Sequence, residues 1–194
     1  MSVIAWDGRM LAADKRASIG SLYRKTTKIF RRNNCLVGYA GDADKAEELM
    51  AWWAAGANPK EFPEPCRDDS RTWASLLVVS PGGLLHYQRT PYPVRYDSGQ
   101  SMAIGSGRDF AMAAMHLGKT AAEAVDVACA LDSGCGDGVD ALFMDALDSG
   151  KCLHKTTMPI RPAPSSRDPL GQMTLECLEC GRIGWSNLPA EEWR

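Results

Sequence analysis

The sequence lacks the features that would place it in several large classes of protein. No apolar run approaches the roughly 18 residues that a membrane-spanning helix needs. The N-terminus has neither the basic start nor the apolar core of a signal peptide. Neither sign of charge dominates, because 22 basic residues stand against 24 acidic ones, which argues against nucleic acid or an anionic membrane as the main partner. We therefore expect a cytoplasmic protein with no nucleic-acid or membrane partner.

The composition is that of one ordinary globular domain. Of 194 residues, 45% are apolar and 24% charged, which excludes a collagen-like, coiled-coil or largely disordered chain. A chain of this length buries about 70% of the surface that its unfolded form exposes, so it needs no disulfides to fold. The seven cysteines are odd in number. In a chain without an export signal they indicate thiols or a metal site rather than a disulfide framework.

Short apolar runs separated by turn residues predict β-hairpins, and Ala-rich segments with capping residues predict helices. Asp42 or Asp44 can cap the first helix, and Thr120 with Glu123 forms a capping box for the last one. Strands and helices come in blocks, which favours an α+β domain of antiparallel sheets packed against helices. The predicted hairpins cover 3–14, 27–41, 73–87 and 139–156, a further strand covers 102–107, and the helices cover 42–55, 109–117 and 121–131.

From residue 158 onward the chain changes character. Several prolines and a Ser-Ser pair predict a linker at 159–166, and the acidic tail has little periodicity. We therefore divide the chain into a domain at 1–157 and a C-terminal extension at 158–194.

The C-terminal part offers one candidate metal site. Cys152 and His154 are two residues apart on a predicted strand and so share one face. With the Cys177-x-x-Cys180 pair they would make a Cys₃His set suited to tetrahedral zinc. A second C-x-x-C pair is missing, and free thiols in the tail are the alternative interpretation. We expect no other cofactor.

The start of the chain raises the question of an N-terminal nucleophile. Removal of Met1 would leave Ser2 with a free α-amino group. Such an amine titrates near about 7.7–8.0, far closer to neutrality than a lysine does. It can accept the proton of its own hydroxyl, which makes an N-terminal serine both nucleophile and base. Met-Ser is a common start, so this feature gains weight only from the rest of the chain.

From residue 2 to about 148 the sequence resembles the proteasome β-type family of N-terminal nucleophile hydrolases. It is most similar to the HslV peptidases and their bacterial and phage relatives. The resemblance depends on a small-small-Asp strand end, a Lys-hydrophobic segment, a Gly-x-Ala-Gly turn, a Gly-Ser-Gly loop, and a segment similar to the family's Asp-x-x-Ser-Gly element with the strand after it. These segments are 11–14, 24–29, 36–44, 103–107 and 132–142, in the order that the family has them.

The resemblance implies a role for three residues at the reacting centre. Ser2 would attack a peptide carbonyl, Lys28 occupies the position of the catalytic lysine, and Asp14 that of the catalytic aspartate. A cationic Lys28 beside the Ser2 amine would favour the neutral, basic form of that amine, and Asp14 would hold Lys28 in place. Without the family context, Asp14 and Lys28 could equally form a surface ion pair.

Four further residues take supporting roles in the same resemblance. The N–H of Gly41 would contribute to the oxyanion hole, and the Ser106 hydroxyl would bind the α-amine. Asp132 and Cys135 belong to the segment that surrounds the amine. The family nucleophile is threonine, whereas this chain has Ser2, and Cys135 stands where the family usually has a hydroxyl residue.

The resemblance also implies the fold, the activity and the partners. It implies a four-layer α/β/β/α sandwich and a peptidase that acts on peptides or unfolded proteins, with an ATP-dependent unfoldase as a possible partner. Two alternatives remain: an inactive proteasome-like scaffold subunit, and a small-molecule amide hydrolase of the same class. The helix at 46–55 is apolar around much of its circumference, which predicts a homo-oligomer, in this family a ring.

Overall fold

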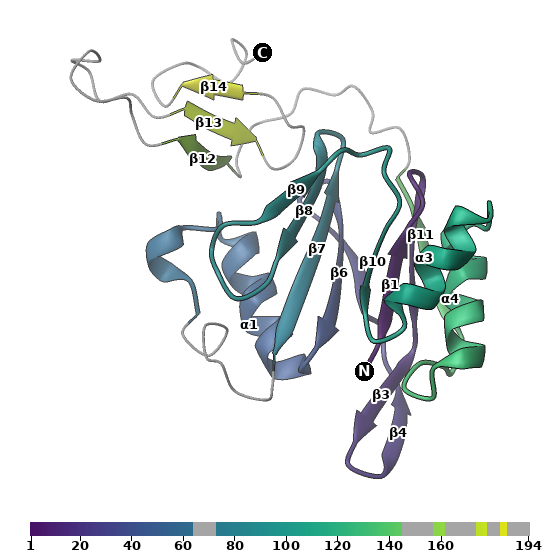
Figure 1. Cartoon of the computed structure of the whole chain (residues 1–194). Helices are drawn as coiled ribbons and strands as arrows, with labels where there is room; N and C mark the ends of the chain where they lie inside the picture. Colours follow the sequence, from purple (N-terminus) through teal and green to yellow (C-terminus); the bar gives the residue numbers. More distant parts are fainter. Residues whose placement is uncertain (64–72, 145–156, 162–173, 178–182, 186–194) are drawn as a thin grey trace.

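The computed structural model describes residues 1–63, 73–144, 157–161, 174–177 and 183–185 (Figure 1). Two antiparallel sheets form its centre, with strand orders β10-β1-β2-β11 and β5-β6-β7-β8-β9. The α+β class is therefore confirmed. The four-stranded sheet consists of β1 (Val3–Trp6), β2 (Met10–Asp14), β10 (Met102–Gly105) and β11 (Val139–Phe143). The five-stranded sheet consists of β5 (Ile29–Arg32), β6 (Cys35–Gly41), β7 (Ala74–Ser80), β8 (Gly83–Tyr87) and β9 (Val94–Tyr96).

Within the described residues, three α-helices cover these sheets. Helix α1 (Ala43–Ala54) packs on β6 and β7, whereas α3 (Arg108–His116) and α4 (Ala121–Leu131) pack on β1 and its neighbours in the other sheet (Figure 1). A short 3₁₀ helix, η1 (Pro59–Glu61), follows α1. Because α3 and α4 present mainly alanines to the sheet, they approach it closely. This places the loops before and after them beside the start of β1.

The buried apolar side chains of the described residues form three clusters, which follow from the alternation of side chains along each strand. One cluster joins α1 to the outer face of the five-stranded sheet, and another joins α3 and α4 to the outer face of the four-stranded sheet. The third contains Ile4, Leu36, Leu77 and Ile104, which come from both sheets. Burial on both faces explains why these strands carry near-continuous apolar runs.

The local signals in the sequence place most of these elements where the structure has them. Asp42, rather than Asp44, caps α1, since its carboxylate accepts a hydrogen bond from the Lys45 N–H. Thr120 and Glu123 form the predicted capping box at the start of α4. The predicted hairpins at 3–14, 27–41 and 73–87 are present as the antiparallel pairs β1–β2, β5–β6 and β7–β8.

One hairpin has no counterpart among the sequence-based expectations. Strands β3 (Arg16–Ile19) and β4 (Leu22–Lys25) pair and project from the body of the molecule (Figure 1). Every residue of β4 is exposed, so the segment has no buried face to create an apolar alternation. Strand β9 was missed for the same reason, because two of its three residues are exposed.

The structure confirms the elements predicted for the C-terminal part of the chain only in part. The first strand of the predicted hairpin at 139–156 is β11, and its second strand lies outside the described residues. Part of the predicted linker at 159–166 is instead a strand, β12 (Thr157–Arg161), which pairs with β13 (Thr174–Cys177), and β13 pairs with β14 (Ile183–Trp185). Proline is tolerated at such a sheet edge because its missing N–H interrupts no inner ladder. The boundary between 157 and 158 stays a prediction.

The candidate zinc ligands cannot be placed. Cys152, His154 and Cys180 lie outside the described residues, and of Cys177 only the backbone, at the end of β13, is described. Within the described ranges no cluster of three or more potential metal ligands occurs. In the same ranges, no helix is both long and apolar enough to cross a bilayer.

Candidate active site

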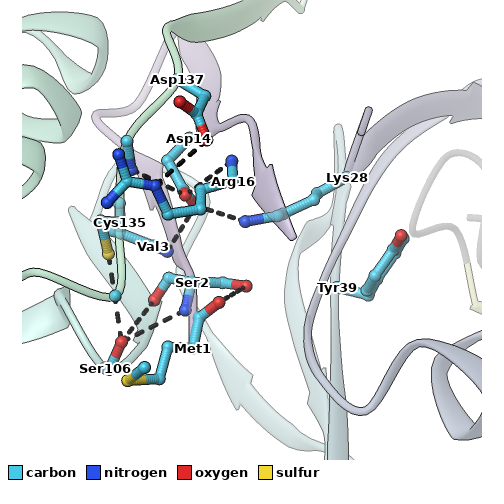
Figure 2. Close-up of polar contacts among 12 residues, drawn as sticks. Met1, Ser2, Val3, Asp14, Arg16, Lys28, Tyr39, Ser106, Cys135 and Asp137 are labelled. Atoms are coloured by element: carbon cyan, nitrogen blue, oxygen red, sulfur yellow. Dashed lines mark hydrogen bonds and ion pairs between the residues drawn. The ribbon is translucent and has the colours of Figure 1, made fainter. Parts of the chain in front are cut away.

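Ser2 lies at the start of β1, almost fully buried, among polar groups from three loops (Figure 2). Its N–H donates to the Ser106 hydroxyl at 3.2 Å, and its own hydroxyl donates to the Met1 carbonyl at 2.5 Å. The Ser2 carbonyl accepts from the Gly107 N–H at 3.3 Å. Because Met1 is attached, the Ser2 nitrogen is a peptide nitrogen, which can donate a hydrogen bond but cannot act as a base.

The loop that carries Ser106 requires a glycine at its first position. Gly105 has a φ of +97°, and a Cβ on it would lie 2.1 Å from the Ser2 carbonyl oxygen. An L-residue would therefore be strained and would also collide with the backbone of Ser2. Gly105 pairs with Val3 in the β1–β10 ladder, and this register carries the following Ser106 to the Ser2 nitrogen.

Asp14 and Lys28 form a buried ion pair beside Ser2. The Lys28 ammonium donates to Asp14 Oδ1 at 2.7 Å, and the two side chains are 3% and 0% exposed. Figure 2 shows the two side chains pointing toward one another. Asp14 ends β2 in one sheet and Lys28 precedes β5 in the other, so the pair connects the two sheets at the edge of the cleft. This is not the surface ion pair that was the alternative interpretation of these residues.

The Asp14 carboxylate is the most highly coordinated group in the site. Besides Lys28, it accepts backbone N–H donors from Val3 at 2.9 Å and from Arg16 and Gly136 at 3.1 Å each. Charged acceptors form stronger hydrogen bonds than neutral ones. The carboxylate therefore fixes the position of β1, β3 and the 132–138 loop around Ser2 at once.

Asp132, Cys135 and Ser106 form a chain of polar contacts that leads to Ser2. The Cys135 thiol donates to Asp132 Oδ2 at 3.4 Å, and its sulfur lies 4.0 Å from Ser106 Oγ. Burial, with the nearby carboxylates, raises the pKa of Cys135 to about 12, so the thiol is protonated at neutral pH. Hydrogen bonds from the Gly134 N–H and then from Ser106 lower the pKa of Asp132.

Gly41 lines the same cleft as Ser2 and Lys28, a depression of about 790 Å³. Its φ is +112°, and a Cβ there would lie 2.2 Å from the Trp73 carbonyl oxygen. Glycine is therefore required where β6 turns into α1. The role of its N–H in an oxyanion hole stays a prediction. Tyr39 lies on the same side of the cleft, and burial raises its pKa.

The sequence analysis missed Arg16, which joins three parts of the site. Its guanidinium pairs with Asp137 at 3.1 Å, donates to the Ser133 carbonyl at 2.9 Å, and lies 4.9 Å from the centre of the Tyr23 ring. It thereby fastens the β3–β4 hairpin to the 132–138 loop. The available signal was an acidic and a basic residue two positions apart, Asp14 and Arg16. The hydrogen-bond acceptors of Arg16 in the 132–138 loop, Ser133 and Asp137, are more than 100 residues away.

The structure thus brings all seven candidate residues to one region, although their catalytic roles stay predictions. Six of them are linked by hydrogen bonds and the Asp14–Lys28 ion pair, either directly or through the backbone of the 132–138 loop. Gly41 lines the same cleft from the end of β6 in the five-stranded sheet. The candidates are Ser2, Asp14, Lys28, Gly41, Ser106, Asp132 and Cys135.

No family model and no curated protein matches this sequence, but solved structures do match its fold. HslV from Trypanosoma brucei has a TM-score of 0.56 and 23% identity, over 73% of this chain and 97% of its own. BPH from Thiobacillus denitrificans has a TM-score of 0.58 and 21% identity, over 74% and 97% of the two chains.

A second structure of BPH, in complex with epoxomicin, has a TM-score of 0.56 and 18% identity, over 75% of this chain and 98% of its own. The chain therefore spans nearly the whole length of these proteins. At identities this low, the structural similarity establishes the fold but not the chemistry, which has to be argued from the site. This chain has the HslV and proteasome β-type fold.

Proposed function

We propose that this protein is a proteasome-like, HslV-type peptidase that hydrolyses peptide bonds with Ser2 as an N-terminal nucleophile. The observation that supports this best is the buried Asp14–Lys28 pair, which lies beside Ser2 at the edge of an open cleft. A buried ion pair contributes little to stability compared with apolar packing of the same volume. Its presence at the mouth of a cleft favours a chemical role.

The proposed reaction uses the free α-amine of Ser2 as the base. The amine accepts the hydroxyl proton while the Ser2 oxygen attacks the substrate carbonyl, and the resulting oxyanion accepts a hydrogen bond from the Gly41 N–H. The protonated amine then gives its proton to the leaving amine, which leaves an ester on Ser2. Water, activated by the same amine, releases the product. Ser106, already 3.2 Å from the nitrogen, orients the amine throughout.

The proposal requires cleavage of the bond between Met1 and Ser2, because an amide nitrogen is not a base. We expect protein whose intact mass lacks one methionine to hydrolyse short fluorogenic peptides, and protein that retains Met1 to be inactive. The two forms should be prepared from one sequence, with and without treatment by a methionine aminopeptidase, so that they differ only in Met1. Equal turnover in both forms would contradict the proposal.

If the purified protein retains Met1, the second candidate function is favoured, which is an inactive scaffold subunit of the same fold. In the structure the Met1 side chain packs against Gly134. A Cβ added to Gly134 would lie 2.5 Å from the Met1 Cβ. A small-molecule amide hydrolase uses the same nucleophile, and it would cleave simple amides while leaving longer peptides intact. No turnover of peptides or amides by methionine-free protein would favour the scaffold.

We further propose that the chain forms a four-layer sandwich and assembles as a homo-oligomeric ring in the cytoplasm, within the bacterial or phage branch of this fold. An ATP-dependent unfoldase would supply unfolded substrate. The sequence argument from α1 does not support assembly, because Trp52 packs on Phe62 and Tyr87 of the same chain. Exposed apolar side chains on β3–β4 and on α3 and α4 support it instead. They are Ile19, Leu22, Tyr23, Phe110, Met112, Leu117 and Leu131.

Light scattering on the purified protein tests this assembly. We expect a molar mass several times the 21.1 kDa of one chain, because a group of exposed apolar side chains on one hairpin, Ile19, Leu22 and Tyr23, is typical of a surface that a neighbouring subunit covers. Replacing Leu22 and Tyr23 together by lysine should lower that mass. A stable monomer at micromolar concentration would contradict the ring.

A further inference from the structure

A second cavity, of about 540 Å³, adjoins the Ser2 cleft. Its walls come from β7, β8 and β9 of one sheet, from β10 of the other sheet and from the start of α3. Trp73, which is 40% exposed, lines both spaces. Neither Ser2 nor Lys28 lines the second cavity, so a ligand there would be held apart from the proposed reacting centre.

Two polar side chains occupy positions in this cavity that continue an apolar face. Along β7 and β8 the face toward the other sheet carries Leu77, Val79 and Leu84, which belong to the cluster between the sheets. Side chains alternate along a strand, so Ser75 and His86 lie on that same face, and both line the cavity. Because Leu77 pairs with His86, Ser75 and His86 are diagonal neighbours on adjacent strands.

Each of these two side chains has a buried polar atom without a hydrogen-bond partner among the described residues. The atoms are Ser75 Oγ and His86 Nε2, on residues that are 1% and 8% exposed. A buried hydroxyl or ring nitrogen without a partner destabilises a fold. Diagonal neighbours on one face of a sheet are roughly 7–8 Å apart, so one polar atom placed between the two is within reach of both. The pair therefore points to a ligand that brings such an atom to this place.

The contact of His86 with Gln88 determines the hydrogen-bonding role of His86 Nε2. The Gln88 side-chain nitrogen lies 3.3 Å from His86 Nδ1. Because an amide nitrogen can only donate, Nδ1 accepts, and the proton of the neutral ring is on Nε2. Burial lowers the pKa of His86, which keeps the ring neutral near pH 7. His86 thus offers an N–H donor, whereas the Ser75 hydroxyl can donate or accept.

The charged side chains that line the cavity do not favour a charged ligand. Arg108, the first residue of α3, is paired with Asp109 at 3.4 Å, and Arg89 has an interaction partner as well. The two groups that lack partners, on Ser75 and His86, are neutral. Burying an ion against neutral groups carries a large desolvation penalty, so the site suits an uncharged ligand.

Much of the remaining wall is apolar or aromatic. Trp73 and Tyr96 contribute rings. Met102 and Ile104, from β10, also line the cavity and belong to, or pack on, the cluster between the sheets. Aromatic pairs gain free energy beyond the area that they bury, and a methionine sulfur makes a further favourable contact with a ring. This wall therefore favours an aromatic ligand.

We propose that this cavity binds a phenol, whose hydroxyl accepts a hydrogen bond from His86 Nε2 and donates one to Ser75 Oγ while its ring packs on the apolar wall. Two sources supply this chemistry: the tyrosine side chain of a peptide that lies across the Ser2 cleft and passes Trp73, or a free small phenol. The first source rests on the proposed peptidase function, whereas the second is independent of it.

Direct binding measurements test this without any turnover. Met1-retaining protein is titrated with p-cresol and with acetyl-Ala-Ala-Tyr-amide, and each is compared with its counterpart without the hydroxyl, toluene and acetyl-Ala-Ala-Phe-amide. Calorimetry gives the affinities, and the ¹⁵N signals of the His86 ring report contact at Nε2. We expect saturable binding of at least one phenol with a shift of the Nε2 signal, and binding of its counterpart weaker by about tenfold. Tighter binding of the Tyr peptide than of p-cresol identifies a peptide side chain, and the reverse identifies a free phenol.

Substitutions of the two polar residues separate a binding role from a structural one. Ser75→Ala should weaken phenol binding by about fivefold or more without lowering the melting temperature, because the deleted hydroxyl has no partner among the described residues. His86→Phe keeps an aromatic ring, removes the donor and should weaken binding as well. Ser80→Ala is the matched control and should leave the affinity unchanged, because its hydroxyl donates to the Gly83 carbonyl at the other end of β7.

Three results would overturn the proposal, whether or not the protein hydrolyses peptides. They are no saturable binding of either phenol, equal affinity for the counterparts without the hydroxyl, and equal affinity in Ser75→Ala. Any of them would leave Ser75 Oγ and His86 Nε2 to ordered water alone.

Discussion

Ser2→Ala, in protein freed of Met1, is expected to lose peptide hydrolysis by a factor of at least about a thousand, since the proposed mechanism forms the acyl ester on Ser2 alone. The one hydrogen bond that the hydroxyl donates among the described residues goes to the Met1 carbonyl, which is absent once Met1 is removed, so thermal stability and assembly should not change. Initial rates on short fluorogenic peptides measure the effect, because such peptides need no unfoldase.

Ser2→Thr is the matched control for this variant. Threonine keeps the oxygen and adds a methyl group that restricts χ1, so activity should be retained or increased. Ser106→Ala is expected to lower kcat less than Ser2→Ala does, since it removes an orienting hydrogen bond and leaves the nucleophile in place. Unchanged hydrolysis in Ser2→Ala would mean that another residue attacks the substrate, with Ser106 and Cys135 the nearest candidates.

Asp14→Ala is expected to have the largest effect on stability of any substitution in the site, whereas Lys28→Met should mainly remove activity. Loss of Asp14 leaves a buried ammonium without its partner and three backbone donors without an acceptor. Breaking a buried pair costs about 3–5 kcal/mol, out of about 5–15 kcal/mol for a typical domain. Lys28→Met leaves the carboxylate with its three backbone donors.

Chemical denaturation and peptide kinetics on the same samples separate these two effects. Lys28→Met should fold with a smaller loss of free energy than Asp14→Ala and still lose nearly as much activity as Ser2→Ala, because residues of one catalytic unit are strongly non-additive. Asp14→Asn keeps the shape of the side chain and should fall between the two in stability. Equal destabilisation by Asp14→Ala and Lys28→Met, with full activity in the latter, would reduce the pair to a structural link between the sheets.

Much of the fold follows from the sequence because its signals are local or periodic. The Asp42 cap and the Thr120–Glu123 capping box each depend on residues within four positions, and both are in the structure. The apolar runs of β6 and β7 are buried on both faces, so they predict strands without fixing which strands pair. The β3–β4 hairpin was missed because its exposed residues carry no burial pattern.

The candidate site could be predicted only from the resemblance to a family. Asp14 and Lys28 are 14 residues apart in an unremarkable polar context, and nothing local indicates that the two sheets bring them within 2.7 Å. The contacts of Arg16 with Asp137 and Ser133 depend on tertiary packing between distant segments in the same way. Contacts between distant segments are set by tertiary packing, which residue patterns alone do not encode.

The central claim is that the Ser2 oxygen forms the acyl intermediate, and capture of that intermediate tests it most directly. Methionine-free protein is incubated with an activated peptide ester, quenched in acid and digested, and the acylated peptide is located by mass spectrometry. The account predicts one acyl group on the N-terminal peptide, attached at Ser2, in wild-type protein and none in Ser2→Ala. Acylation at Ser106 or Cys135, or the same labelling in Ser2→Ala, would contradict it.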